Sequence, residues 1–354
     1  IKYLTGIIPL FSFVVGYMTF LGAKTLEEAR KKLKDVIDFL TAGYFAYCLA
    51  LVVCIAIGST TMVWMSNRLR IDDGFTGSDF DGLMLLLFIG FSFALSKIAA
   101  NSRIKNILNI NIVILALLII LGIKKGTIIS VLIGLAVIFT AAFFFREKRV
   151  LQPKNSAGTL VLIVLSPLLL IAPFYIFLEC QDLLGNLVYN ITNRFSDNDT
   201  LDVRLTNWMY YMRHWMGNLN IFTAIFGFGT DSSRETCFFL SSMQPEKGYT
   251  QPHIHNIYLE YFYNWGLVAL FYFLPLLLIV YKNVQNILKI TANSMLKLFS
   301  AVSSACILFY LVFYTAESPA VPGTIVFFAL IGFLESAKYA FAQPFESSFQ
   351  KSAV

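Results

Sequence analysis

Charged residues are scarce in this chain of 354 residues. Only 14% are Asp, Glu, Lys or Arg, whereas 57% are apolar and the mean hydropathy is +0.70. A soluble globular protein usually has about 25% charged and about 45–50% apolar residues. The composition therefore excludes a soluble enzyme and a disordered tail, and it predicts a membrane protein.

Cysteine is also scarce, with five residues in the chain. Cys48, Cys54 and Cys306 lie inside apolar runs, where a thiol behaves as a small hydrophobic side chain. Cys180 and Cys237 lie in a polar stretch, and their spacing leaves open whether they pair. A secreted disulfide scaffold is therefore excluded.

Long apolar runs dominate what remains. About 20 apolar residues in a helix cross roughly 30 Å of hydrocarbon. The runs of this length lie at 3–22, 40–59, 83–99, 106–122, 127–145, 159–178, 259–281, 297–315 and 324–340. We therefore expect an all-α polytopic membrane protein with about nine spans in this chain and one large external loop.

The distribution of the 27 Lys and Arg residues predicts the topology. The larger share falls in the loops on one side, which are therefore expected to be cytoplasmic. On this basis the net charge of +6 does not indicate nucleic acid as a partner. The other side holds a loop of nearly eighty residues, and loops of that length are usually functional. The expected organisation is membrane helices 1–6 at 1–179 with a basic external hairpin at 122–126, a large periplasmic loop with amphipathic helices at 180–257, and membrane helices 7–9 with a cytoplasmic tail at 258–354.

The large loop begins with a helical pattern. Apolar residues recur at spacings of three and four, which predicts one apolar face. These residues are Leu201, Leu205, Trp208, Met212, Trp215 and Met216. Arg204, Asn207 and Tyr211 fall on another face, and a plain surface role is expected for His214. The local pattern alone is equally consistent with a helix lying on the bilayer, in which Arg204 is only a solvated charge.

Two further motifs follow in the loop. The glycines of Phe226-Gly227-Phe228-Gly229 allow either an ordinary loop turn or a close approach of the backbone to a ligand. His253 and His255 lie just before the next apolar run. A His-x-His without a third ligand at suitable spacing does not predict a metal site. An unperturbed His pKa of about 6.5 suits proton transfer, and His255 lies nearer the helix, so we expect it to be the base.

Taken in order, these motifs resemble a known family. The order is a basic helical hairpin, Arg-Leu-x-x-Trp from Arg204, Gly-Phe-Gly at 227–229, His-x-His-Asn-x-x-Leu-Glu from His253, and then Asn264-Trp265-Gly266. The set resembles the bacterial O-antigen ligase and polymerase superfamily, membrane glycosyltransferases that act on undecaprenyl-linked glycans. Motif-level similarity covers about residues 120–145 and 194–285. The family's usual twelve or so spans imply that about three more precede those seen here.

The resemblance implies inverting transfer of a glycan from undecaprenyl diphosphate to a sugar hydroxyl, without a cofactor or metal, at the periplasmic face of the inner membrane. Arg204 stands at the position of the family's large-loop arginine, and His255 at that of its His before Asn. The resemblance implies that Arg204, Lys124 and Lys125 bind the donor diphosphate and that His255 is catalytic. The family's hairpin usually carries an Arg, and this chain has Lys124 and Lys125 there, which cannot hold a phosphate bidentately. The further candidate substrate contacts are His253, Asn256, Arg194, Arg213, Gly227 and Gly229.

The sequence leaves three functions to compare. An O-antigen ligase acting on a lipid A-core acceptor is preferred, and a polymerase of O-antigen or capsule repeat units on the same carrier is the alternative. A transporter or flippase of lipid-linked sugars is more distant, because such a protein normally keeps an ionisable group deep in the membrane. Glu335, for instance, lies near the end of a predicted span, where snorkelling suffices. The expected partners are the lipid-linked donor, lipid A-core or a glycan as acceptor, and membrane lipids.

Overall fold

The structure, a computed structural model, is helical apart from one short hairpin. It describes residues 8–23, 25–57, 62–65, 68–71, 78–96, 102–122, 125–144, 199–229, 232–233, 236, 254, 256–289, 293–315 and 321–342. The helices are α1 (Ile8–Tyr17), η2 (Met18–Phe20), α2 (Leu26–Ala56), α3 (Ser78–Leu95), α4 (Ser102–Gly122), α5 (Lys125–Phe144), α8 (Asp199–Gly217), α9 (Ile221–Phe226), α11 (Ile257–Trp265), η4 (Gly266–Ala269), α12 (Leu270–Leu288), α13 (Ser294–Phe313) and α14 (Val321–Ala342). Strands β1 (Met62–Met65) and β2 (Arg68–Ile71) pair antiparallel, with Met62 opposite Ile71.

The predicted class, an all-α polytopic membrane protein, is confirmed. Within the described residues, five segments are long and apolar enough to cross a membrane: Leu26–Cys54, Arg103–Ile120, Ile257–Leu288, Ser294–Phe313 and Thr324–Phe341. Three shorter apolar helices accompany them, at Phe11–Phe20, Phe80–Leu95 and Thr127–Ala141. Each predicted span overlaps a described helix except 159–178, which lies outside the described residues.

Helix α2 begins well before the predicted span at 40–59 and includes residues that the charge pattern had assigned to a loop. Its first turn is stabilised because the Thr25 hydroxyl accepts a hydrogen bond from the Glu28 amide, at 3.1 Å. Buried residues then recur every three or four positions along one face, namely Ala29, Leu33, Ile37, Thr41, Tyr44 and Cys48. The 31 residues extend roughly 46 Å, so the basic first turns project beyond the hydrocarbon.

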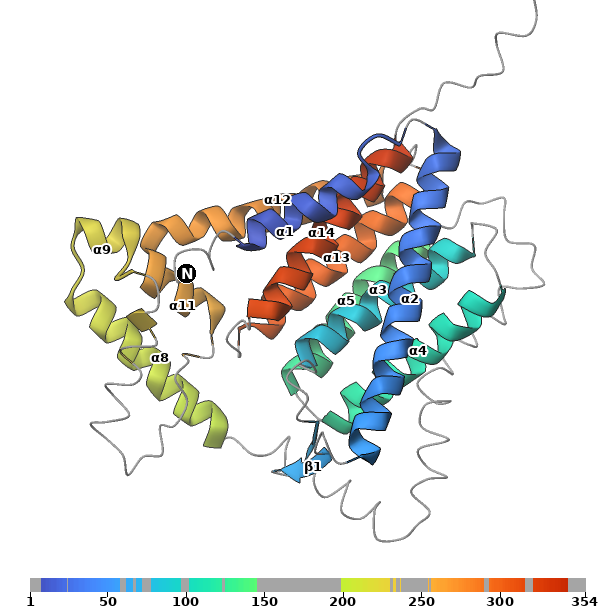
Figure 1. Ribbon diagram of the computed structural model, residues 1–354. Coiled ribbons are helices and arrows are strands. Elements are labelled where there is room, and N and C mark those ends of the chain that lie inside the picture. Colours follow the sequence, from blue (N-terminus) through green and yellow to red (C-terminus); the bar gives the residue numbers. More distant parts are fainter. Residues whose placement is uncertain are drawn as a thin grey trace, which may run out of the picture.

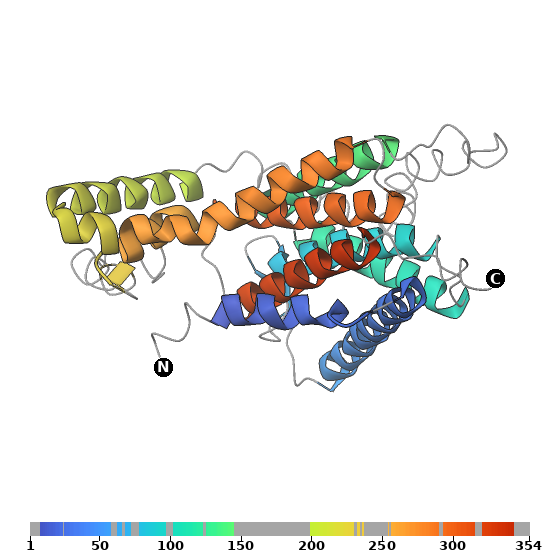
Figure 2. The ribbon, with the colours of Figure 1, turned by 90° about the horizontal axis from the view of Figure 1, so that it is seen from above.

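Helix α13 is the centre of the bundle, and it packs against α3, α5, α12 and α14 (Figures 1 and 2). Its span is 78% buried, whereas the segments Leu26–Cys54 and Ile257–Leu288 are only 22% buried. The peripheral helices therefore present much of their apolar surface outward, as expected of helices that face lipid.

Helices α1 and α14 cross closely through two glycines. A Cβ atom added at Gly16 would lie 2.0 Å from the carbonyl oxygen of Ala329, and one added at Gly332 would lie 2.0 Å from that of Phe13. Such a close approach is typical of membrane helices, which associate by van der Waals packing of small residues. Side chains at these two positions would force the helices apart.

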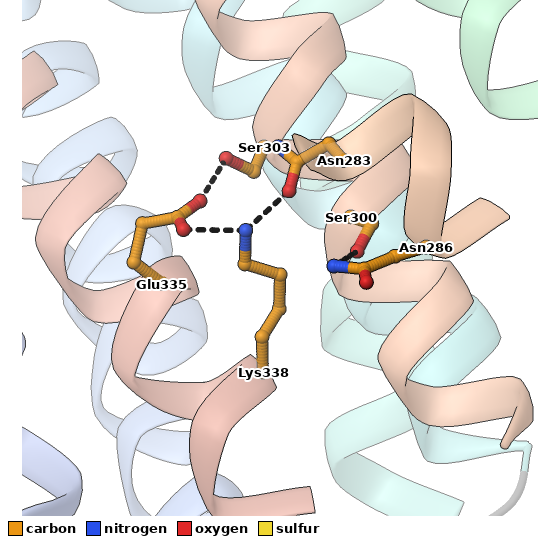
Figure 3. A network of polar contacts seen from close by, with 6 residues as sticks. All are labelled: Asn283, Asn286, Ser300, Ser303, Glu335 and Lys338. Atoms are coloured by element: carbon orange, nitrogen blue, oxygen red, sulfur yellow. Dashed lines mark hydrogen bonds and ion pairs between the residues drawn. The ribbon is translucent and has the colours of Figure 1, made fainter. Parts of the chain in front are cut away.

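A buried polar network joins α12, α13 and α14 (Figure 3). The ammonium of Lys338 lies 2.5 Å from a carboxylate oxygen of Glu335 and also donates to the side-chain oxygen of Asn283. The Ser303 hydroxyl donates to the other carboxylate oxygen of Glu335, at 2.7 Å. Lys338 is only 5% exposed, so Glu335 is held by an ion pair inside the protein, and the interpretation that it only snorkels is wrong.

Replacing Lys338 with Ala should destabilise the protein by about 3 kcal/mol, because it leaves the half-buried Glu335 carboxylate without its cation. The double variant Lys338→Met with Glu335→Gln should lose less stability than Lys338→Ala, since both charges are removed together. Thermal unfolding of the detergent-purified variants measures the difference. Equal stability of the single and double variants would mean that the pair is solvated.

Candidate functional site

The site lies where α8, α9 and α11 meet, at the end of α12 that is remote from the main bundle (Figures 1 and 2). Helix α11 is fixed at its first turn. The Asn256 side chain accepts a hydrogen bond from the Leu259 amide, at 3.0 Å, and the Ile257 amide donates to the carbonyl of Tyr314 at the end of α13, at 2.9 Å. The start of α11, which follows the His-x-His motif in the sequence, is therefore attached to the central helix of the bundle.

Helix α9 forms because Asn220 and Thr223 cap it reciprocally. The Asn220 side chain accepts hydrogen bonds from the amides of Phe222 and Thr223, at 2.9 and 3.0 Å. The Thr223 hydroxyl in turn accepts a hydrogen bond from the Asn220 amide, at 2.8 Å. This capping box fixes a sharp corner between α8 and α9.

The Gly-Phe-Gly turn packs onto the end of α11. The amides of Phe228 and Gly229 donate to the carbonyls of Tyr263 and Asn264, at 2.9 and 3.0 Å. Gly227 has φ +68° and Gly266 has φ +56°, and a Cβ atom added to either would lie within 2.5 Å of backbone atoms in the other segment. We call this contact the glycine clasp. Both glycines are needed because the two backbones meet without room for side chains.

An aromatic cluster lies between α8 and α11. Tyr211, Ile254 and Tyr263 are buried, and Trp208 and Trp215 pack against them. The indole N–H of Trp208 donates to the carbonyl of Ile254, at 2.9 Å. Tyr211 is 1% exposed, so its expected position on the face of Arg204, away from the packed residues, is wrong. The packed stripe is shifted because α8 meets α11 through positions 208, 211 and 215.

His214 is half-buried, so the expected plain surface role is wrong. Its Nδ1 atom lies 2.8 Å from the hydroxyl of Tyr263, which is also 3.0 Å from the hydroxyl of Thr236. The His214 ring packs on Phe228, with centroids 5.5 Å apart. No local pattern indicated this contact, because Tyr263 is 49 residues away in the sequence.

An open groove of about 570 Å³ runs between α8 and α11. Its lining is almost entirely apolar and comes from Leu205, Trp208, Met209, Met212, Met216, Tyr258 and Leu259, with Arg213 and Asn256 as polar members. Three of these residues are methionines, whose flexible thioether chains adapt to irregular apolar ligands.

The predicted site residues are only partly brought together. Arg213 is exposed at the groove, and Asn256 also lines it. Arg204 is half-buried near the start of α8, and Lys125 begins α5. Lys124, Arg194, His253 and His255 lie outside the described residues. The predicted roles of all these residues stay predictions, as do the substrate contacts expected for Gly227 and Gly229.

Comparison with known families identifies this region. Residues 110–274 match the model of the family described as O-antigen ligase. This region is therefore similar to the O-antigen ligase family. The match includes α5, α8, α9 and α11, and with them the groove, the aromatic cluster and the glycine clasp. None of the curated proteins compared with the chain matches it.

The O-antigen ligase region confirms the resemblance seen in the motifs and supports an enzyme of the ligase and polymerase type in a multi-pass membrane protein. Where the structure describes side chains, no three His, Cys, Asp or Glu residues gather as they would around a metal ion.

Gly266→Ala should destabilise the glycine clasp of the O-antigen ligase region by about 1–3 kcal/mol, because the new Cβ would lie 2.5 Å from the carbonyl oxygen of Ala224 at a positive φ. Gly43→Ala is the matched control, since nothing lies within 4 Å of a Cβ there. Unfolding temperature and susceptibility to limited proteolysis measure both changes. Equal behaviour of the two variants would contradict the clasp.

Proposed function

We propose that this protein is an O-antigen ligase-like inverting glycosyltransferase. It transfers a glycan from undecaprenyl diphosphate to a sugar hydroxyl of lipid A-core, at the periplasmic face of the inner membrane. The observation that carries the proposal is the apolar groove between α8 and α11, which has a guanidinium at Arg213 and the residue next to His255 in its lining. A lipid-linked donor is complementary to this groove, because it consists of an apolar chain that ends in an anionic diphosphate.

The groove suits the isoprenoid chain of the donor. Met209 and Met216 are 53% and 56% exposed there, a large exposure for apolar side chains, and burying them under a lipid chain would remove this surface from water. The diphosphate then lies beside Arg213, which is in the lining of the groove. A guanidinium forms two parallel hydrogen bonds to phosphate oxygens, which an ammonium cannot do.

The two arginines of α8 cannot act from the same side of this helix. Arg204 and Arg213 are nine residues apart, which is about two and a half turns, and so they project from opposite faces roughly 13 Å apart along the axis. Arg213 belongs to the groove. We therefore assign the donor diphosphate in the groove to Arg213, and we keep Arg204 and the hairpin residues Lys124 and Lys125 as the cations implied by the family.

The chemistry requires a cation near the leaving group and a base near the acceptor. As the bond between the sugar and the diphosphate breaks, negative charge develops on the diphosphate, and fixed cations stabilise it. The acceptor hydroxyl attacks the opposite face of the anomeric carbon, which inverts its configuration, and passes its proton to His255. The products are undecaprenyl diphosphate and the glycosylated acceptor. With cations supplied by side chains, the reaction needs no metal.

Deletion of the gene in its source bacterium should leave full-length polymer unattached to lipid A-core, because the last transfer is lost while polymerisation continues. Mass spectrometry of the extracted surface glycan measures this product. Lipid A-core that carries a single repeat unit would instead indicate a polymerase, and an unchanged glycan would contradict both functions.

Arg213→Ala should weaken donor binding by about tenfold or more, since a charge-assisted bidentate contact contributes roughly 1.5–3 kcal/mol. Arg213→Lys should recover little of this loss. Arg204→Ala should also abolish transfer, because the family resemblance implies a second cation that stabilises the charge on the leaving diphosphate from outside the groove, and Arg204→Lys should restore little. Donor affinity and turnover of purified variants, each with and without excess chelator, measure these effects.

Donor affinity in the Arg213→Ala and Arg204→Ala variants decides which arginine binds the donor diphosphate. Normal donor affinity in Arg213→Ala would remove Arg213 from the donor site. Transfer that is lost in chelator and restored by Mg²⁺ or Mn²⁺ would contradict a metal-independent reaction.

A further inference from the structure

Helix α9 presents its large apolar side chains outward. Ile221 and Phe222 are each 72% exposed, and Ile225 and Phe226 are 38% and 58% exposed. The smaller residues Thr223 and Ala224 are the half-buried ones in this helix. A helix on the surface of a soluble protein has the reverse arrangement, because its apolar face is turned toward the core.

The glycine clasp fixes this orientation. The Gly227 amide donates to the carbonyl of Thr223, at 3.0 Å, so the last turn of α9 continues directly into the clasp. On the packed side, the carbonyl oxygen of Ala224 lies 2.5 Å from the place that a Cβ atom on Gly266 would occupy. Turning α9 to bury Phe222 would separate Ala224 from Gly266 and break the clasp.

The exposed apolar surface extends into the corner that precedes α9. Met216 and Leu219 are 56% and 52% exposed, and residues 216–229 include no charged side chain. Contiguous apolar surface of this kind marks a site of contact with another protein or with a membrane.

The place of α9 in the fold favours the membrane. Helix α9 packs on η4, which directly precedes α12, and both lie far from α13 (Figures 1 and 2). The 19 residues of α12 extend roughly 28 Å, which is close to the hydrocarbon thickness of about 30 Å. Element η4 therefore lies near one boundary of the hydrocarbon. Leu267 and Phe271, at this end of the span, are 52% and 78% exposed, as expected of a surface that faces lipid.

From these observations we propose that α9 is a membrane anchor, whose outward face inserts among the lipid acyl chains next to the headgroups. The inserted residues are Ile221, Phe222, Ile225 and Phe226. Helices that lie in the interface bury their apolar face by about 5–10 Å in this way. The anchor is distinct from the donor groove, which is lined by α8, Asn256 and α11, and the proposal does not depend on the function proposed above.

Photocrosslinking tests the anchor in a chain that keeps its natural cysteines. Benzoylphenylalanine replaces Phe222, and the purified protein is reconstituted in vesicles of phosphatidylethanolamine and phosphatidylglycerol. After irradiation, mass spectrometry should show a phospholipid adduct. The same replacement at Phe271, on the span, is the lipid-facing reference and should give the same adduct.

Tyr210 on α8 is the matched control, because it is also aromatic and its ring packs on His214 and Tyr211, with centroids 6.3 and 6.1 Å apart. Benzoylphenylalanine at this position should give no lipid adduct. The proposal is overturned by a crosslink from position 222 to another part of the chain, which would mean that protein covers the face. It is equally overturned by no adduct at 222, or by as much lipid adduct at 210 as at 222.

A second measurement uses a nitroxide label on Phe222→Cys in a chain whose five natural cysteines are replaced by Ala. In the same vesicles, collisions with oxygen, which dissolves in hydrocarbon, should exceed those with a water-soluble nickel chelate. The label on Phe271→Cys should behave alike. More frequent collisions with the nickel chelate at 222 would show a face in water, and few collisions with either reagent would show a face covered by protein. Either result contradicts the anchor.

Discussion

Helix α8 is held near the bundle by the glycine clasp, in which the turn at 227–229 lies directly on the end of α11. Two amides of the turn donate to carbonyls of Tyr263 and Asn264, and the side-chain oxygen of Asn264 accepts a third hydrogen bond from the amide of Ser233, at 2.9 Å. The aromatic cluster and the groove form between α8 and α11, which the clasp brings together. The clasp therefore helps to hold α8, which carries Arg204 and Arg213, against α11.

The sequence predicts the class and most of the apolar helices because both depend on composition and on the length of apolar runs. The residues at which helices begin and end are less predictable. Residues such as Arg30 and Lys34 resembled a loop, yet they extend α2, because a stripe of buried residues every three or four positions continues through them. Charge alone does not end a helix when its other face is packed.

In the site, the order of the motifs predicted which segments matter, while their contacts could not be derived from it. The glycines of 227–229 were consistent with a turn or a ligand contact, and only the position of Gly266 shows the close backbone contact. Likewise the roles of Tyr211 and His214 depend on Tyr263, which belongs to another helix. Long-range pairing of this kind leaves no periodic signal in the sequence.

The ion pair of Glu335 and Lys338 also has a consequence for the biosynthesis of the protein. The two residues are three positions apart on one helix, so they can pair within α14 before any neighbouring helix is present. Each charge alone would oppose insertion, by at most about 2.5–3.5 kcal/mol, which is the cost at the helix centre. As a pair they carry no net charge, so the membrane potential exerts no net force on them during insertion. Helix α14 can therefore enter the bilayer as an electrically neutral segment, and Asn283 and Ser303 add their hydrogen bonds when α12 and α13 pack against it.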